Sequence, residues 1–206
     1  MTDIFSQWTE NRAVWNKGAD QVLEQVRQVE KLLPFALRGF DVDNGSEFLT
    51  WHLWRYFLHR PMPVDLRRSR PYKKNDQAYV EQKNWTHVRQ LLGYERIENP
   101  DLVPLINELY RTWGELHNFF CPTLKLQSKV RQGSKTKRKY AKPQTPCQRL
   151  LDCPDLSAQQ KANLQTRFAQ LNPLTLKNQL EEQLQRLFDR AQCPVRPIMS
   201  QPSPKP

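Results

Sequence analysis

Two carboxylates of this 206-residue sequence lie at positions that are typical of functional residues, one on a helix face that should be buried and one at the end of a strand. The apolar stripe of one predicted helix recurs at steps of three and four residues and consists of Ala78, Glu81, Trp85, Val88 and Leu92. Glu81 therefore falls in the middle of a face that should be buried, where an ionised carboxylate is costly unless it is paired or bound to metal. Asp43 directly follows the predicted strand 35–42, at the strand end where α/β sheets gather their ligands.

Each carboxylate also has an ordinary explanation. Asp43 opens a D-N-G string, which is among the commonest turn sequences. Glu81 can be salt-bridged or can extend to the edge of its helix, and basic partners abound. Taken together, two carboxylates that face a basic surface are typical of a divalent-metal site directed at phosphate. The residues by themselves favour metal-dependent phosphoryl transfer on nucleic acid.

The elements that must position these carboxylates alternate between strand and helix patterns. Residues 3–16 predict two short strands joined by a turn around Glu10-Asn11, and residues 18–33 predict an amphipathic helix stopped by Pro34. The next patterns predict a strand at 35–42, a helix at 46–59, a strand at 63–68 and a helix at 76–92. This order predicts an α/β layer with helices packed on a mixed sheet.

The strand signal fades in the second half of the chain. One helix is predicted from Leu102 to Phe120, another from Ser157 with Gln160 in capping-box position, and a third from Pro173 after Asn172. Between them, residues 121–150 hold nine Lys or Arg and no acidic residue, which predicts an extended basic connector. The last fourteen residues hold five prolines and are predicted to be disordered.

The composition indicates a polyanionic partner. Lys and Arg number 32 against 21 Asp and Glu, for a net charge of +11 and a pI near 9.7. No apolar run approaches the roughly 20 residues that span a bilayer, and the N-terminus lacks a signal-peptide pattern, so no membrane partner is expected. The four cysteines form no CxxC pair, which favours reduced thiols and a cytoplasmic location.

Two strings carry a resemblance to a known family. GFDVDNGSEF followed by SRPYKKNDQAYVEQKNW resembles the catalytic core of DDE-type transposases and retroviral-like integrases, with the closest likeness to bacterial insertion-sequence transposases. The likeness continues through QLLGYERI, HNFF, KLQSK and PQTPCQRLL, and covers the chain from about residue 3 to about residue 190.

This resemblance implies a ribonuclease-H-like fold in which three acidic residues hold two Mg²⁺ (or Mn²⁺) ions. By the match, Asp43 is the second acid and Glu81 the third. In this family the metals activate the attacking oxygen and stabilise the leaving oxygen of two successive reactions. Water first attacks the DNA at the transposon end, and the freed 3′-hydroxyl then attacks the target DNA. The implied partners are double-stranded DNA and further copies of the chain, in the cytoplasm of a prokaryote.

The sequence departs from the family pattern in two places. It has more residues between the second and third acids, and the extra length falls near residues 59–63. It also begins at the family's second strand, so the opening strand with the first acid is missing, and Asp3 or Asp41 would be poor substitutes. We therefore expect weak metal binding and a truncated gene or a start codon assigned too late. The alternative function is a catalytically dead DNA-binding remnant, whereas an RNA-binding protein is disfavoured because RNP and KH signatures are lacking.

Further residues are predicted to contact DNA. The basic segment before the predicted helix 76–92 is predicted to bind phosphates beside the scissile bond through Arg67, Arg68, Arg70, Lys73 and Lys74. Asn75, Lys83 and Asn84 are predicted to orient the DNA or the helix start, with a plain helix cap as the alternative for Asn75. The run 125–142 is predicted to contact flanking or target DNA.

The predicted organisation has four parts. They are a partial catalytic core at 1–95, a helix with the basic connector at 96–150, a helical region at 151–192 and a Pro-rich tail at 193–206.

Overall fold

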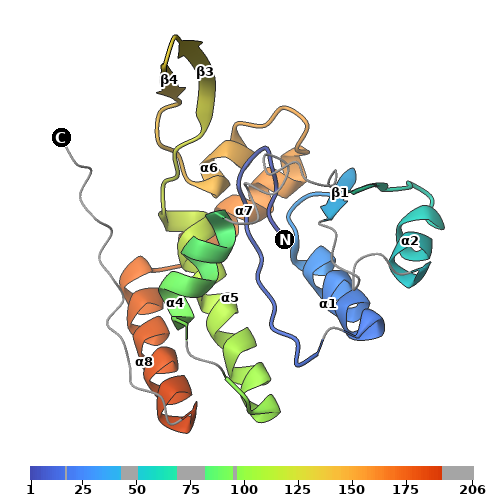
Figure 1. Ribbon diagram of the computed structural model, residues 1–206, viewed down its shortest axis with the longest axis vertical. Coiled ribbons are helices and arrows are strands. Elements are labelled where there is room, and N and C mark those ends of the chain that lie inside the picture. Colours follow the sequence, from blue (N-terminus) through green and yellow to red (C-terminus); the bar gives the residue numbers. More distant parts are fainter. Residues whose placement is uncertain (17, 43–50, 69–81, 95–96, 192–206) are drawn as a thin grey trace. The chain divides into compact units, whose positions relative to one another are not determined.

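The computed structural model describes residues 1–16, 18–42, 51–68, 82–94 and 97–191 (Figure 1). It is a mixed α/β protein, as predicted, and its chain divides into two compact units. Unit 1 comprises Met1–Asn11 and Glu108–Glu181, and unit 2 comprises Arg12–Asn107 and Glu182–Pro206. Within the described residues, no helix is long and apolar enough to span a membrane.

The first helix of unit 2 is α1, Ala19–Leu32, where a helix was predicted at 18–33. Its buried stripe is Val22, Leu23, Val26 and Val29, which supplies the apolar face that the three- and four-residue spacing requires. The helix stops because Leu33 adopts an extended backbone (φ −67°, ψ 135°), the conformation that a following proline favours.

Two parallel strands and the helix between them form the sheet of unit 2. Strand β1 is Gly39–Val42, helix α2 is described over Trp51–Leu58, and strand β2 is Asp65–Arg68. The register pairs Gly39 with Asp65 and Val42 with Arg68. Helix α2 buries Leu53 and Phe57, and the Phe57 ring lies 4.9 Å from that of Phe40 on β1. The predicted strands at 35–42 and 63–68 are thus present in shorter form.

The predicted helix 76–92 is described from residue 82, and its geometry differs from the prediction. After a helical turn at 82–84, η1 (Trp85–Arg89) is a π-helix, and α4 (Gln90–Leu92) completes the element. A π-helical turn contains an additional residue, so it rotates the side chains that follow. Trp85, predicted to be buried, is 50% exposed, while His87 is 1% exposed.

The N-terminal segment contradicts the two predicted strands at 3–16. It forms one isolated antiparallel bridge between Thr2 and Thr9, and its turn lies at residues 4–6 instead of Glu10-Asn11. The Asp3 carboxylate causes this turn because it accepts hydrogen bonds from both the backbone N–H (2.7 Å) and the hydroxyl (2.5 Å) of Ser6.

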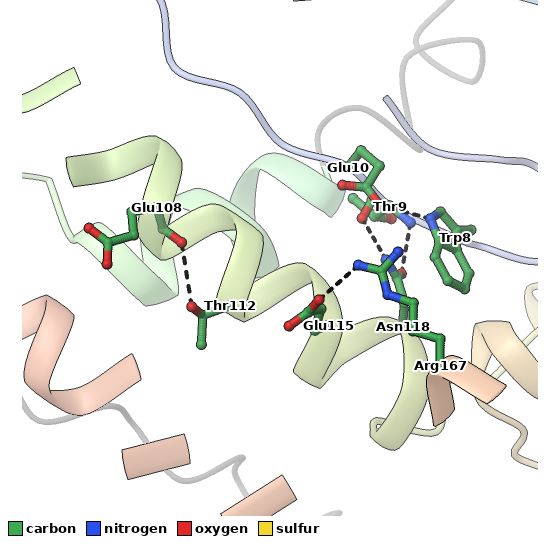
Figure 2. A network of polar contacts seen from close by, with 8 residues as sticks. All are labelled: Trp8, Thr9, Glu10, Glu108, Thr112, Glu115, Asn118 and Arg167. Carbon is green, nitrogen blue, oxygen red and sulfur yellow. Dashed lines mark hydrogen bonds and ion pairs between the residues drawn. The ribbon is translucent and has the colours of Figure 1, made fainter. Parts of the chain in front are cut away.

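In unit 1 this segment is fixed to the helix α5, Val103–Phe120. The buried Asn118 amide accepts from Thr9 N–H (2.9 Å) and donates to Thr9 C=O (3.0 Å), as a neighbouring strand would (Figure 2). Trp8 packs edge-on against Phe119 at 5.3 Å. Residues 1–11 therefore belong to unit 1, and the predicted division at 1–95, 96–150 and 151–192 stays a prediction.

The predicted helices of the second half are present. A short 3₁₀ helix, η2 (Pro100–Leu102), comes first. It is followed by the α-helices α5 (Val103–Phe120), α6 (Pro146–Leu151), α7 (Ala158–Gln170) and α8 (Pro173–Ala191). The capping box of Ser157 and Gln160 is formed as predicted. The side chain of Asn172 accepts from Leu174 N–H at 2.9 Å, so it caps α8.

The predicted extended connector at 121–150 is wrong in its central part. Strands β3 (Leu126–Gln132) and β4 (Lys135–Tyr140) form an antiparallel hairpin, which extends away from α6 and α7 within unit 1 (Figure 1). The turn is possible because Gly133 adopts φ +60°, a conformation that L side chains rarely take. In the described part of the chain, β3–β4 and β1–β2 are separate two-stranded sheets.

Candidate functional site

The parallel pair β1–β2 brings two predicted DNA-binding arginines to the edge of the sheet that Asp43 follows. Parallel strands end at the same edge, and Val42, the last residue of β1, lies opposite Arg68. Phe40 and Val42 are buried while Asp41 is exposed, which is the alternation of a half-buried strand. Arg67 lies opposite Asp41, so the exposed face of the pair carries both signs of charge.

Arg67 already has a carboxylate partner. Its Nη2 and Nε atoms both lie 2.7 Å from Asp65 Oδ2. This hydrogen bond, with the charges of Asp65 and Asp41, raises the pKa of the Arg67 guanidinium. Both side chains of this pair are largely exposed, so a phosphate can replace the carboxylate at little cost.

The helix that follows positions two further predicted residues. Asn84 is exposed, and Lys83 is half-buried with its Nζ 3.4 Å from Nε2 of the buried His87. Trp85 is half-exposed beside them, and its ring lies 6.4 Å from that of Tyr94. Within the π-helical turn His87 is buried and Trp85 is exposed, which the sequence spacing did not indicate.

The remaining predicted site residues lie outside the described part of the chain: Asp43, Arg70, Lys73, Lys74, Asn75 and Glu81. The predicted Mg²⁺ site at Asp43 and Glu81 therefore stays a prediction. Among the described residues, no three His, Cys, Asp or Glu side chains are grouped so that they could hold a metal ion.

A polar cluster joins the two helices beside the sheet. Glu30 of α1 accepts two hydrogen bonds from Arg60 (2.8 and 2.9 Å) and one from the Tyr56 hydroxyl (2.5 Å). Burial alone would raise the pKa of Glu30, but these hydrogen bonds and the Arg60 charge lower it. The same cluster raises the pKa of Tyr56, first through burial and then through Glu30. Since Tyr56 and Arg60 flank the end of α2, this cluster fixes the helix between β1 and β2.

A second group of residues, not recognised in the sequence, supports the basic hairpin in unit 1. Arg149 on α6 is 6% exposed, and its guanidinium donates to Thr123 Oγ1 (2.7 Å) and to Thr123 C=O. It also donates to Ser6 C=O (3.1 Å) and Gln7 Oε1 (3.3 Å). Burial lowers the pKa of Arg149. In the sequence, Arg149 was only one more member of a basic run.

The base of the hairpin is closed by backbone contacts beside Arg149. Thr123 and Gln144 form an antiparallel bridge, and Ala141 N–H donates to Lys125 C=O at 2.8 Å. Lys125 Nζ donates to Phe5 C=O at 2.7 Å and lies 4.8 Å from the centre of the Phe5 ring. The exposed ribbon thus begins from a fixed base.

The chain is similar to the uncharacterized protein y4rM of Sinorhizobium fredii, with 36% identity over 149 residues. The aligned region covers 72% of this chain and 42% of the relative, so the chain spans less than half of that protein's length. No family model matches the chain, and no solved structure matches it.

Proposed function

We propose that this chain is part of a transposase or integrase that cuts and joins double-stranded DNA by Mg²⁺-dependent phosphoryl transfer. The observation that carries the proposal is the β1–α2–β2 unit, in which Asp43 directly follows a half-buried strand of a parallel pair. Two such carboxylates with a divalent ion would activate the attacking oxygen and stabilise the leaving oxygen. The sheet would belong to a ribonuclease-H-like fold.

The described residues would supply positioning and charge. Arg67 and Arg68 end β2 at the edge that Asp43 follows, where they would bind phosphates of the DNA backbone. Lys83 and Asn84 on the next helix would contact the same strand of DNA. Such contacts fix the scissile phosphate in line with the attacking oxygen, which is the main contribution a protein makes to this reaction.

Its partners would be transposon ends, target DNA and further copies of the chain. We also propose a cytoplasmic location in a prokaryote, which the free thiols of Cys121, Cys147 and Cys153 support. The second candidate function is a non-catalytic DNA-binding protein. It is supported by the net charge of +11, because lysine and arginine side chains bind DNA phosphates without a metal ion.

A strand-transfer assay separates the two functions. The purified chain is incubated with a labelled duplex in Mg²⁺ or Mn²⁺, beside the variants Asp43→Asn, Glu81→Gln and, as control, Asp101→Asn. Asp101 is an exposed acid on η2, so its variant should retain activity. We expect cut or joined products from the unchanged chain and from the control, and none from the other two. If the unchanged chain binds DNA but forms no product, the non-catalytic function is supported. If the variants Asp43→Asn and Glu81→Gln still form product, the proposed site is refuted.

A further inference from the structure

The β3–β4 hairpin is a strongly basic ribbon with both faces open. Every residue of the two strands is exposed. Six of them are cationic: Lys129, Arg131, Lys135, Lys137, Arg138 and Lys139. No acidic residue occurs between Glu115 and Asp152 in the sequence. A surface of this kind attracts a polyanion from every direction around the ribbon.

The strand register divides these cations between two faces. Lys129 lies opposite Arg138, and Arg131 lies opposite Thr136, so these four form one face, the arginine face. The opposite face, the lysine face, pairs Lys135 with Gln132, Lys137 with Val130 and Lys139 with Ser128. Each face carries three cations, but both arginines are on one of them.

The free hairpin is electrostatically unfavourable. Lys129 and Arg138 are directly opposite like charges, an arrangement that destabilises an antiparallel pair. A two-stranded hairpin is itself only marginally stable in water. Its base, however, is held through Thr123 by Arg149 and by the bridge to Gln144. A polyanion bound close to the ribbon would reduce the repulsion between Lys129 and Arg138 and so stabilise the hairpin.

We propose that the β3–β4 hairpin binds double-stranded DNA by lying in the major groove, with the arginine face toward the base edges. A two-stranded ribbon fits the B-form major groove, which is about 12 Å wide and 8.5 Å deep. Arginine reads guanine O6 and N7 with its planar fork, whereas lysine acts as a point charge suited to phosphates. The lysine face would reach the phosphates of the groove walls.

The geometry favours DNA over other anionic partners. Double-stranded RNA has a deep and narrow major groove that side chains do not reach, so it cannot admit this ribbon. An anionic membrane would require an apolar face, but the apolar residues of the ribbon are divided between its faces. Val130 lies on the lysine face, whereas Leu126 and Tyr140 pair at the base. This inference does not depend on the catalytic proposal, because it concerns other residues and needs no metal.

The test compares two triple variants that remove equal charge. One is Lys129→Gln/Arg131→Gln/Arg138→Gln on the arginine face, and the other is Lys135→Gln/Lys137→Gln/Lys139→Gln on the lysine face. The matched control removes three cations from the helices α5, α7 and α8, through Arg111→Gln, Lys161→Gln and Lys177→Gln. Binding to a fluorescent duplex is measured by anisotropy in EDTA over a salt series. Circular dichroism verifies that each variant is folded.

We expect both hairpin variants to bind more weakly than the control, but for different reasons. The lysine-face variant should lower the slope of log K against log salt by up to about 2.7, since each lost phosphate contact removes about 0.9. The arginine-face variant should lose discrimination between guanine-containing and guanine-free duplexes. Replacing guanine by 7-deazaguanine removes the N7 acceptor without changing charge, so it should weaken the unchanged chain at least about fivefold and leave this variant unaffected.

Several results would overturn the proposal. Hairpin variants that bind like the control would show that the ribbon does not contact DNA. Insensitivity of the unchanged chain to 7-deazaguanine, or equal binding of double-stranded RNA or anionic vesicles, would exclude the major groove. Equal loss of guanine discrimination in both hairpin variants would refute the assigned face. Because the measurements use EDTA, a failed strand-transfer reaction leaves their outcome unchanged.

Discussion

Replacing Arg149 should destabilise unit 1 more than replacing any exposed arginine of that unit. Arg149 is 6% exposed, and its guanidinium donates to three main-chain or side-chain oxygens of Ser6 and Thr123 and to the side-chain oxygen of Gln7. Arg149→Met keeps most of the side-chain volume but removes every one of these donors. The buried carbonyl of Ser6 would then lose the guanidinium as its donor.

The magnitude follows from the number and type of these hydrogen bonds. A hydrogen bond to a charged group contributes about 1.5–3 kcal/mol, and an orphaned buried acceptor costs about 1–3 kcal/mol. Burial of the charge opposes this gain, as the lowered pKa of Arg149 indicates. We therefore expect Arg149→Met to lower the free energy of unfolding by about 3–5 kcal/mol. Arg149→Lys keeps the charge without the planar fork, so it should cost about half as much.

Urea unfolding followed by tryptophan fluorescence measures this effect, because Trp8 is buried in the same unit. The control is Arg111→Met on the exposed side of α5, which should change the free energy of unfolding by less than about 0.5 kcal/mol. An Arg149→Met variant as stable as the control would refute the role of the guanidinium. An Arg149→Lys variant equal to the unchanged chain would show that charge alone is sufficient.

Three other predictions concern particular contacts. Lys129→Glu places a carboxylate opposite Arg138, so it should stabilise the hairpin by about 0.2–1 kcal/mol in amide exchange while weakening DNA binding; faster exchange would contradict the register. Because the pKa of Glu30 is lowered, its contribution is present above its usual value of 4.5 and lost as the pH falls through the folded value. Glu30→Gln, which weakens the contact with Arg60, should therefore cost about 1–2 kcal/mol at pH 7 and less in acid, and a loss independent of pH would contradict this. Burial raises the pKa of Cys147 to about 11, so at pH 8 a thiol reagent should label it only on unfolding, as mass spectrometry of the peptides would show.

The sequence predicted best the elements that are defined by local patterns. The capping box at Ser157 and the amide of Asn172 gave the starts of α7 and α8 because a cap is satisfied within three residues. The stripe of α1 and the proline after it gave that helix for the same reason. In these places local and tertiary preferences agree, which is the condition under which sequence reasoning succeeds.

It failed where long-range contacts decide the structure. The N-terminal segment was predicted as two strands, but Asn118, more than a hundred residues away, replaces the strand partner of Thr9. Trp85 was placed on a buried stripe because a regular period of 3.6 was assumed, whereas it is half-exposed at the first position of a π-helical turn. The hairpin was missed because it has no apolar face, although Gly133-Ser134 was a usable turn signal.

Two unfavourable charge arrangements belong to the same hairpin, one at its base and one on its strands, and together they affect how it would bind a polyanion. Arg149 is buried among neutral oxygen atoms of residues at the hairpin base, and Lys129 faces Arg138 on the ribbon. The first orders the base of the hairpin before any ligand arrives, so less conformational entropy is lost on docking. The second leaves a repulsion between Lys129 and Arg138 that a bound polyanion relieves, so part of the binding energy is the removal of that repulsion. On this reasoning Lys129→Glu and Arg149→Met both weaken DNA binding, but the first does so in a more stable hairpin and the second in a less ordered one.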